Sequence, residues 1–213
     1  MKFGLACEGI TDHITIANIL CGYFSNPDLD EEIAELQPSF DETEQKQGEG
    51  GWRMLLQYLT LARFREDVLN TEYVILQIDS DISEEFAVSN KDDDGNELST
   101  EILIENIIAA LIFNINSGKS GFYNSHANKI IFAISVHSLE CWLVAYHSEQ
   151  IAAHNCFDIL KTVINPNNIR VVKKRKNYDQ LSQPFLKREN IEIVAQKSPS
   201  FHLFIQQLQN IPL

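Results

Sequence analysis

The sequence predicts an α/β fold in which an open, mainly parallel sheet is flanked by helices. Short apolar segments alternate along the chain with segments whose apolar residues recur at helical spacing. The strand segments are apolar at nearly every position, which is typical of parallel strands buried on both faces. The 213 residues, of which 44% are hydrophobic and 22% are charged, are enough for one packed domain.

The first 150 residues contain a regular alternation of strands and helices. In order, the elements we predict are strand 2–7, helix 10–24, strand 32–36, helix 52–67, strand 73–78, helix 102–116, strand 129–135 and helix 139–147. The clearest strand is 73–78, Tyr-Val-Ile-Leu-Gln-Ile, because it is apolar and rich in β-branched residues. Ser99 and Ser138 are suited to cap the helices that follow them.

The pattern is less regular beyond residue 150. We expect short strands at 170–172 and 191–195, and a last helix over 201–208 that follows a capping Ser198 and a first-turn Pro199. The chain is therefore divided into a domain over 1–150 and a basic carboxyl-terminal α+β extension over 151–213 that packs on the same domain.

Composition also limits the setting in which the protein works. No segment reaches the roughly 20 apolar residues of a membrane span, and the first eight residues lack the features of a signal peptide. The four cysteines, at 7, 21, 141 and 156, show no paired spacing and are expected to be reduced thiols. We expect a cytoplasmic protein with no membrane partner, in which 102–113 belongs to a buried helix.

The charge of the chain is distributed unevenly. The formal net charge is −13, yet residues 171–199 hold seven basic and three acidic residues, so the first 170 residues carry −17. An acidic protein can bind nucleic acid where divalent cations neutralise clustered carboxylates and a basic strip holds the strand. The alternative is an acidic protein with a solvated basic loop.

Carboxylates follow three of the predicted strands. Glu8 follows the first strand, and Asp12 lies one helical turn later. Asp79 and Asp81 follow the strand 73–78 and point the same way by alternation. Glu140 lies in the first turn of the helix that follows the strand at 129–135.

The carboxyl ends of parallel strands meet at one edge of a sheet, so these acids are expected to converge there. Carboxylates this close oppose one another's ionisation. A hard divalent cation that takes oxygen ligands, Mg²⁺ or Mn²⁺, would reduce the repulsion between them. Each acid also has an ordinary alternative. Asp-x-Asp is common in loops, and Asp12 or Glu140 could serve only as first-turn acids favoured by the helix dipole.

These residues carry a resemblance to a known family. Glu8-Gly9 after the opening strand, Asp79-x-Asp81 after a buried strand and the strand–helix alternation resemble the Toprim domain over about residues 1–150. That domain is shared by topoisomerases, bacterial primases, the ribonuclease that matures small ribosomal RNA, and OLD-family nucleases. Residues 8–12, Glu-Gly-Ile-Thr-Asp, are most similar to the OLD branch, whose opening motif carries a second acid four residues after the first.

A second similarity concerns the later part of the chain. Residues 135–143, Ser-Val-His-Ser-Leu-Glu-Cys-Trp-Leu, together with 198–201, Ser-Pro-Ser-Phe, are similar to small stand-alone Toprim proteins of the RloB kind. Those proteins usually carry proline before the Glu-x-Trp segment, and His137-Ser138 departs from that pattern.

The resemblance implies a metal-dependent nuclease that hydrolyses phosphodiester bonds of DNA or RNA with one or two Mg²⁺ or Mn²⁺ ions. The metal ligands it implies are Glu8, Asp12, Asp79, Asp81 and Glu140, of which Glu8, Asp79 and Asp81 are also catalytic. OLD-type enzymes use a carboxyl-terminal lysine against the phosphate charge. The candidates are Lys173, Lys174 and Lys176, with Lys174 and Lys176 included in the catalytic set.

Independently of any family, a negatively charged strand is expected to rest on the basic strip. This strip consists of Lys173, Lys174, Arg175 and Lys176. The RloB-like similarity implies a role in anti-phage defence with a separately encoded ATPase, and leaves a homo-oligomer open. Two alternatives stand beside the nuclease: a non-catalytic Toprim-like module that binds nucleic acid or a partner protein, and a phosphohydrolase for a small nucleotide.

Overall fold

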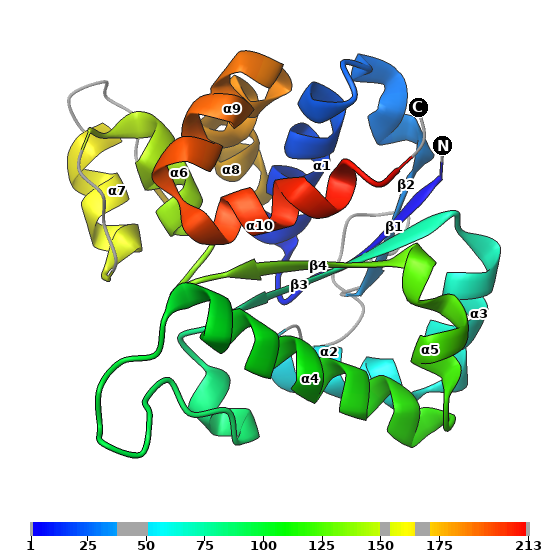
Figure 1. Cartoon of the computed structure of the whole chain (residues 1–213). Coiled ribbons are helices and arrows are strands. Elements are labelled where there is room, and N and C mark those ends of the chain that lie inside the picture. Colours follow the sequence, from blue (N-terminus) through cyan, green and yellow to red (C-terminus); the bar gives the residue numbers. More distant parts are fainter. Residues whose placement is uncertain (1, 38–50, 150–153, 165–170, 212–213) are drawn as a thin grey trace.

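A single parallel sheet organises the chain. The computed structural model describes residues 2–37, 51–149, 154–164 and 171–211 (Figure 1). The strands are β1 (Phe3–Ala6), β2 (Ile33–Gln37), β3 (Tyr73–Asp79) and β4 (Ile130–Ser135). Their order in the sheet is β2-β1-β3-β4, and every neighbouring pair is parallel. The expected α/β class, an open parallel sheet flanked by helices, is confirmed.

Side chains alternate along the strands, so each face of the sheet has its own core. Leu5 and Ile75 point into one core, whereas Val74, Leu76 and Ile78 point into the other. All of these side chains are buried. The strands are apolar at nearly every position because helices cover both faces.

Helices cover the two faces in separate groups (Figure 1). The first group packs on the face of Leu5 and consists of α1 (Ile10–Tyr23), η1 (Pro27–Glu32), α6 (Glu140–His147), α7 (Cys156–Ile164), α8 (Arg175–Ser182), η5 (Gln183–Leu186), α9 (Arg188–Lys197) and α10 (Pro199–Leu208). The second group lies on the face of Val74 and consists of α2 (Trp52–Thr60), α3 (Ala62–Asn70), η2 (Ser83–Phe86), α4 (Thr100–Gly118), α5 (Phe122–His126) and η3 (Ala127–Lys129).

Two segments that are distant in sequence meet at Trp142. Its indole N–H donates to the hydroxyl of Ser200 at 2.9 Å, and its ring packs against Phe201 and Phe204. The side chain of Ser198 accepts from Phe201 N–H at the start of α10, as expected for a capping serine followed by proline. This contact joins α6 to α10 and fixes the amino end of α6 close to the carboxyl edge of the sheet.

Several sequence predictions are wrong in detail. The helix expected over 52–67 is two helices, because Leu61 has an extended backbone between them. The strand expected at 191–195 is part of α9, which buries Ile191 and Val194 on one helical face. Among the described residues beyond 150 the regular elements are helices: Val171 and Val172 of the strand expected at 170–172 are not in a strand, and residue 170 lies outside the described residues. Ser138 is not the N-cap residue of α6, because Leu139 occupies that position.

The prediction of four reduced thiols is also wrong. Cys141 and Cys156 form a disulfide that joins the first turn of α6 to the first residue of α7. Cys7 and Cys21 are free and buried. The two bonded cysteines are 15 residues apart in the sequence, and both belong to the core on the face of the sheet that α1 covers.

Helix α4 buries one side only. It packs Leu103, Ile107 and Leu111 against the sheet, whereas Ile102 is 48% exposed and Phe113 is 74% exposed. Its mean hydropathy of 1.2 over 18 residues also meets the requirement for a helix that could cross a membrane, a test that core helices pass as well. The prediction of a buried helix therefore holds for one face of α4.

Candidate functional site

The candidate site lies where three neighbouring strands end. Residue Glu8 follows β1, Asp79 is the last residue of β3, and Glu140 begins α6 shortly after β4. The backbone joins these loops: Ser80 N–H donates to Ser135 C=O at 2.9 Å, and Asp81 N–H donates to His137 C=O at 3.0 Å. The carboxyl ends of β3 and β4 are thereby held together, as expected for a site at the edge of a parallel sheet.

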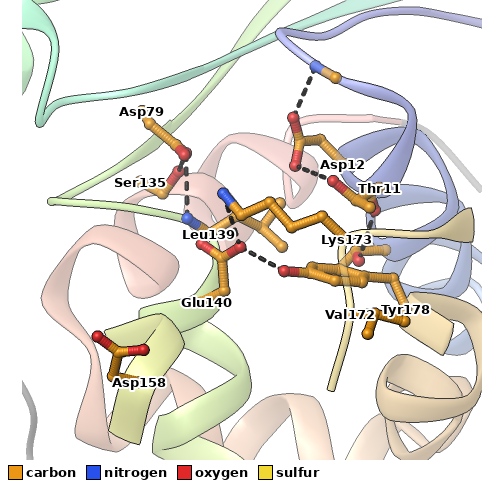
Figure 2. Close-up of polar contacts among 12 residues, drawn as sticks. Thr11, Asp12, Asp79, Ser135, Leu139, Glu140, Asp158, Val172, Lys173 and Tyr178 are labelled. Carbon is orange, nitrogen blue, oxygen red and sulfur yellow. Dashed lines mark hydrogen bonds and ion pairs between the residues drawn. The ribbon is translucent and has the colours of Figure 1, made fainter. Parts of the chain in front are cut away.

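Asp79 is held by three donors. Its Oδ1 atom accepts hydrogen bonds from Gln77 Nε2 at 2.9 Å, from Leu139 N–H at 3.0 Å and from the hydroxyl of Ser135. Figure 2 shows the bonds from Ser135 and Leu139. Since all three donors bind the same oxygen, the side chain of Asp79 is fixed in one orientation.

Gln77 ties Glu8 to the same point. Its Oε1 atom accepts from Glu8 N–H at 3.2 Å, while its Nε2 atom donates to Asp79. Gln77 is fully buried and lies on the same face of β3 as Ile75. The Oε2 atom of Glu8 is buried and has no hydrogen-bond partner among the described residues. A buried carboxylate oxygen without a donor is unfavourable unless a proton or a cation occupies the space beside it.

Asp12 occupies the first turn of α1 and points toward the same place. Its Oδ2 atom accepts from Gly9 N–H at 2.8 Å, and the hydroxyl of Thr11 donates to Oδ1 at 3.3 Å. Asp12 therefore fills the ordinary role of a first-turn acid and also lies in the electrostatic field of the other carboxylates. Because the residue is only 8% exposed, water does little to screen its charge.

Glu140 is held by a phenol and an ammonium group. The Oε1 atom accepts a short hydrogen bond from the hydroxyl of Tyr178 and lies 3.3 Å from Lys173 Nζ (Figure 2). Burial works against ionisation of Glu140, but the bonds from Tyr178 and Ser138 and the charge of Lys173 hold its pKa below the ordinary value. Burial and the charge of Glu140 raise the pKa of Tyr178, so its phenol keeps its proton and donates.

The remaining carboxylates oppose one another's ionisation. Burial, followed by the charges of Asp12, Glu8 and Glu140, raises the pKa of Asp79 well above its usual range. Burial, with Glu140 and Glu8, raises the pKa of Asp12 to about 7. Burial is also the largest cause of the raised pKa values of Glu8 and Asp81. Five carboxyl groups therefore influence one another electrostatically.

Lys173 is the cation within this field. Burial disfavours its charge, but Glu140, Asp79 and Asp12 together raise its pKa, so the ammonium form is stabilised. Its Nζ also lies 5.3 Å from the centre of the Phe157 ring on α7. Lys173 therefore approaches the carboxylates from the face of the sheet that α1, α7 and α8 cover.

The other basic residues of the strip are placed differently. Arg175 forms an ion pair with Glu35 on β2. Lys174 is the cap residue of α8, and both Lys174 and Lys176 are exposed. The structure thus brings Lys173 rather than Lys174 or Lys176 next to the acids, and the prediction that placed Lys174 and Lys176 in the catalytic set is corrected in favour of Lys173.

The chemistry of the donor set fits a hard divalent cation. The clustered ligand atoms are carboxylate oxygens, which Mg²⁺ and Mn²⁺ prefer, and Glu8 Oε2 is a buried oxygen without a partner. In the part of the chain that the structure describes, no three His, Cys, Asp or Glu side chains are already arranged to hold one ion. The fit therefore rests on the type and the convergence of the donors.

Three residues of the site carry weak sequence signals or none. Gln77 is the single polar residue inside the run 73–78, which is a signal that could have been used. Ser135 ends a predicted strand and begins the segment 135–143 of the RloB-like similarity, but nothing in the sequence marks it as a partner of Asp79. Tyr178 lies in a segment with no motif, and only the folded chain brings it to Glu140.

Comparison with known proteins gives no further information about this site. No protein-family model, no curated protein and no solved structure gives a significant match to the chain. The Toprim resemblance therefore stays a prediction carried by the residues themselves.

Proposed function

We propose that this chain is a divalent-metal-dependent phosphodiesterase that acts on nucleic acid. The observation that carries the proposal is the convergence of carboxylates with one lysine at the carboxyl edge of the sheet. The side chains concerned are Glu8, Asp12, Asp79, Asp81, Glu140 and Lys173. Glu8, Asp12, Asp81 and Glu140 each raise the pKa of at least one other carboxyl group, so the site favours a cation.

Asp79 and Glu8 are the best suited to hold that cation. Asp79 is oriented by three donors on one oxygen, and Glu8 has a buried oxygen with no hydrogen-bond partner. Asp12, Asp81 and Glu140 would complete the ligand set. When bound, the ion would supply Lewis acidity toward a phosphoryl oxygen and lower the pKa of a nearby water.

The side chains of this protein would perform the remaining tasks. Lys173 can leave Glu140 and bind a non-bridging phosphate oxygen, because its side chain is 62% exposed and its ammonium form is stabilised. Tyr178 then keeps Glu140 in place through its hydrogen bond. Glu8 would serve either as a ligand of the cation or, through the same free oxygen, as the acceptor of a proton from an attacking water.

One observation favours the non-catalytic alternative. The ion pair between Lys173 and Glu140 already neutralises one carboxylate without any metal, as a stable binding module would require. A module of this kind would bind nucleic acid or a partner protein through the basic strip. The proposed phosphodiesterase would act on DNA or RNA. We further propose that it works with a separately encoded ATPase, in the cytoplasm and in anti-phage defence.

A cleavage assay separates the two functions. Plasmid DNA and single-stranded RNA are incubated with Mn²⁺, and parallel samples contain EDTA or the Asp79→Asn variant. Asparagine keeps the oxygen that accepts from Gln77, Ser135 and Leu139, so the fold is expected to survive. We expect cleavage with Mn²⁺ and none in the two parallel samples, whereas Asp158→Asn, an exposed carboxylate on α7, should cleave normally. Cleavage that persists in EDTA and in Asp79→Asn would contradict the proposal.

A further inference from the structure

An aromatic pair lies next to the carboxylate cluster, on the opposite side from Lys173. Gly51 N–H donates to Glu8 C=O at 2.8 Å, and Trp52 follows directly as the first residue of α2. Phe86 ends η2, which follows Asp81 closely in the sequence. The loop that carries Glu8 is therefore hydrogen-bonded to the residue before Trp52, and the loop that carries Asp81 continues into Phe86.

The two aromatic rings contact each other. The ring centres of Trp52 and Phe86 are 6.1 Å apart with an interplanar angle of 47°. Both side chains are partly exposed and pack with their inner parts against the core. Arg53, whose side chain is 77% exposed, places its guanidinium 4.9 Å from the centre of the Trp52 ring. We name Trp52, Arg53 and Phe86 the stacking platform.

The stacking platform and Lys173 lie on different faces of the sheet. Trp52 and Phe86 belong to the face covered by α2 and α4, whereas Lys173 precedes α8 on the face covered by α1. The carboxylates lie at the edge between them. A nucleic-acid strand that is bound by Lys173 on one face of the sheet and continues across this edge would bring its next bases over the stacking platform.

We propose that the stacking platform binds an unpaired nucleobase of the substrate strand, adjacent to the phosphate that the carboxylate site receives. The inference rests on the proposed function and narrows its substrate to single-stranded DNA or RNA. Indole and guanidinium groups stack on the flat faces of bases in a sequence-tolerant way, and a base inside a duplex offers no free face. Two aromatic groups and one guanidinium beside a phosphodiesterase centre match that chemistry.

Tryptophan fluorescence tests the platform directly, because the chain has only two tryptophans and Trp142 is fully buried. In EDTA, where no cleavage occurs, a twelve-residue oligothymidine and an oligouridine are titrated into the protein. We expect at least one of the two strands to quench the Trp52 emission. If only one does, the result also identifies the preferred substrate as DNA or RNA. A blunt duplex and an abasic oligonucleotide of equal length should bind through phosphates without quenching. Equal quenching by the abasic strand would overturn the proposal. The absence of quenching by both base-containing strands would overturn it as well.

Variants separate stacking from folding. Trp52→Leu keeps an apolar side chain against the core and should weaken oligonucleotide binding, measured by anisotropy, about 5- to 150-fold. Trp52→Phe should lose the quenching signal and keep most of the affinity, and Arg63→Ala, an exposed arginine on α3, is the matched control for Arg53→Ala. Unchanged affinity in Trp52→Leu, with an unchanged melting temperature, would overturn the platform.

The same samples distinguish failure of the platform from failure of the proposed function. Hydrolysis of bis(p-nitrophenyl) phosphate with Mn²⁺ needs no base stacking, so it reports the carboxylate site alone. Hydrolysis without quenching would reject the platform and keep the phosphodiesterase. Quenching without any hydrolysis would keep the platform as part of a binding module.

Discussion

Asp12 offers a sharp test of whether the carboxylates oppose one another in the metal-free protein. The residue is 8% exposed, and burial together with Glu140 and Glu8 raises its pKa from 3.8 to about 7. Asparagine can keep an oxygen that accepts from Gly9 N–H, while its amide NH2 group takes the other position and can donate to the Thr11 hydroxyl, which reverses that hydrogen bond. We therefore predict that Asp12→Asn stabilises the metal-free protein at high pH.

The sign and the size of the effect follow from linkage. A carboxyl whose pKa is raised on folding binds its proton more tightly in the folded state, so its ionisation lowers stability. That loss is absent below about pH 4, grows between pH 4 and pH 7, and is complete above pH 7. At 1.36 kcal/mol per pKa unit, the full loss is about 4 kcal/mol. The hydrogen bond from Gly9 N–H at the amino end of α1, which favours the charged form, is already included in this value.

Asp12→Asn should therefore add roughly 2–4 kcal/mol to the free energy of unfolding at pH 8. For a chain of this length, the melting temperature should rise by at least about 4 °C. Thermal and urea unfolding in EDTA, at pH 8 and at pH 4, measure the effect. Asp158→Asn is the control, because its side chain is 77% exposed and its change should stay within about 0.5 kcal/mol. Destabilisation by Asp12→Asn at pH 8, or an equal gain at pH 4, would refute the reasoning.

Three further outcomes are expected. Gly22→Ala should destabilise the protein by more than about 1–3 kcal/mol in urea unfolding, because a Cβ atom would lie 1.9 Å from a backbone oxygen of η5; a neutral result would place η5 elsewhere. Reduction of the Cys141–Cys156 bond, which closes a 15-residue separation, should lower the free energy of unfolding by about 3 kcal/mol. Alkylation of the unfolded, unreduced chain should accordingly modify two thiols, and modification of four would disprove the bridge. Lys173→Met should reduce Mn²⁺-dependent cleavage about 10²- to 10³-fold, as loss of a group that stabilises developing charge does, while Lys176→Met should reduce it much less; equal losses would assign both to strand binding.

The sequence contains most of the information that positions the acids. Strand 73–78 is apolar on both faces, so its end could be placed at Asp79, and alternation along it predicts the direction of that carboxylate. The Glu-Gly turn after the first strand marks a second strand end in the same way. Because parallel strands end at one edge, the convergence of Glu8 with Asp79 follows from topology.

The rest depends on contacts between distant parts of the chain. Residues 191–195, Ile-Glu-Ile-Val-Ala, alternate like a strand, but packing of Ile191 and Val194 on one side makes them helical. Cysteine pairing cannot be deduced from spacing, since any two of four cysteines could meet. The basic strip holds four similar side chains, and only the approach of α8 to α6 selects Lys173.

The central claim is that the converging carboxylates bind a divalent cation. Calorimetric titration of Mn²⁺ into the wild-type chain, Asp79→Asn and Asp158→Asn at pH 7.5 measures this binding without reference to any substrate. The account predicts saturable binding to the wild type and to Asp158→Asn, and binding at least about tenfold weaker to Asp79→Asn, because a neutral amide replaces a charged oxygen ligand. No saturable binding to the wild type, or equal affinity in all three proteins, would contradict it.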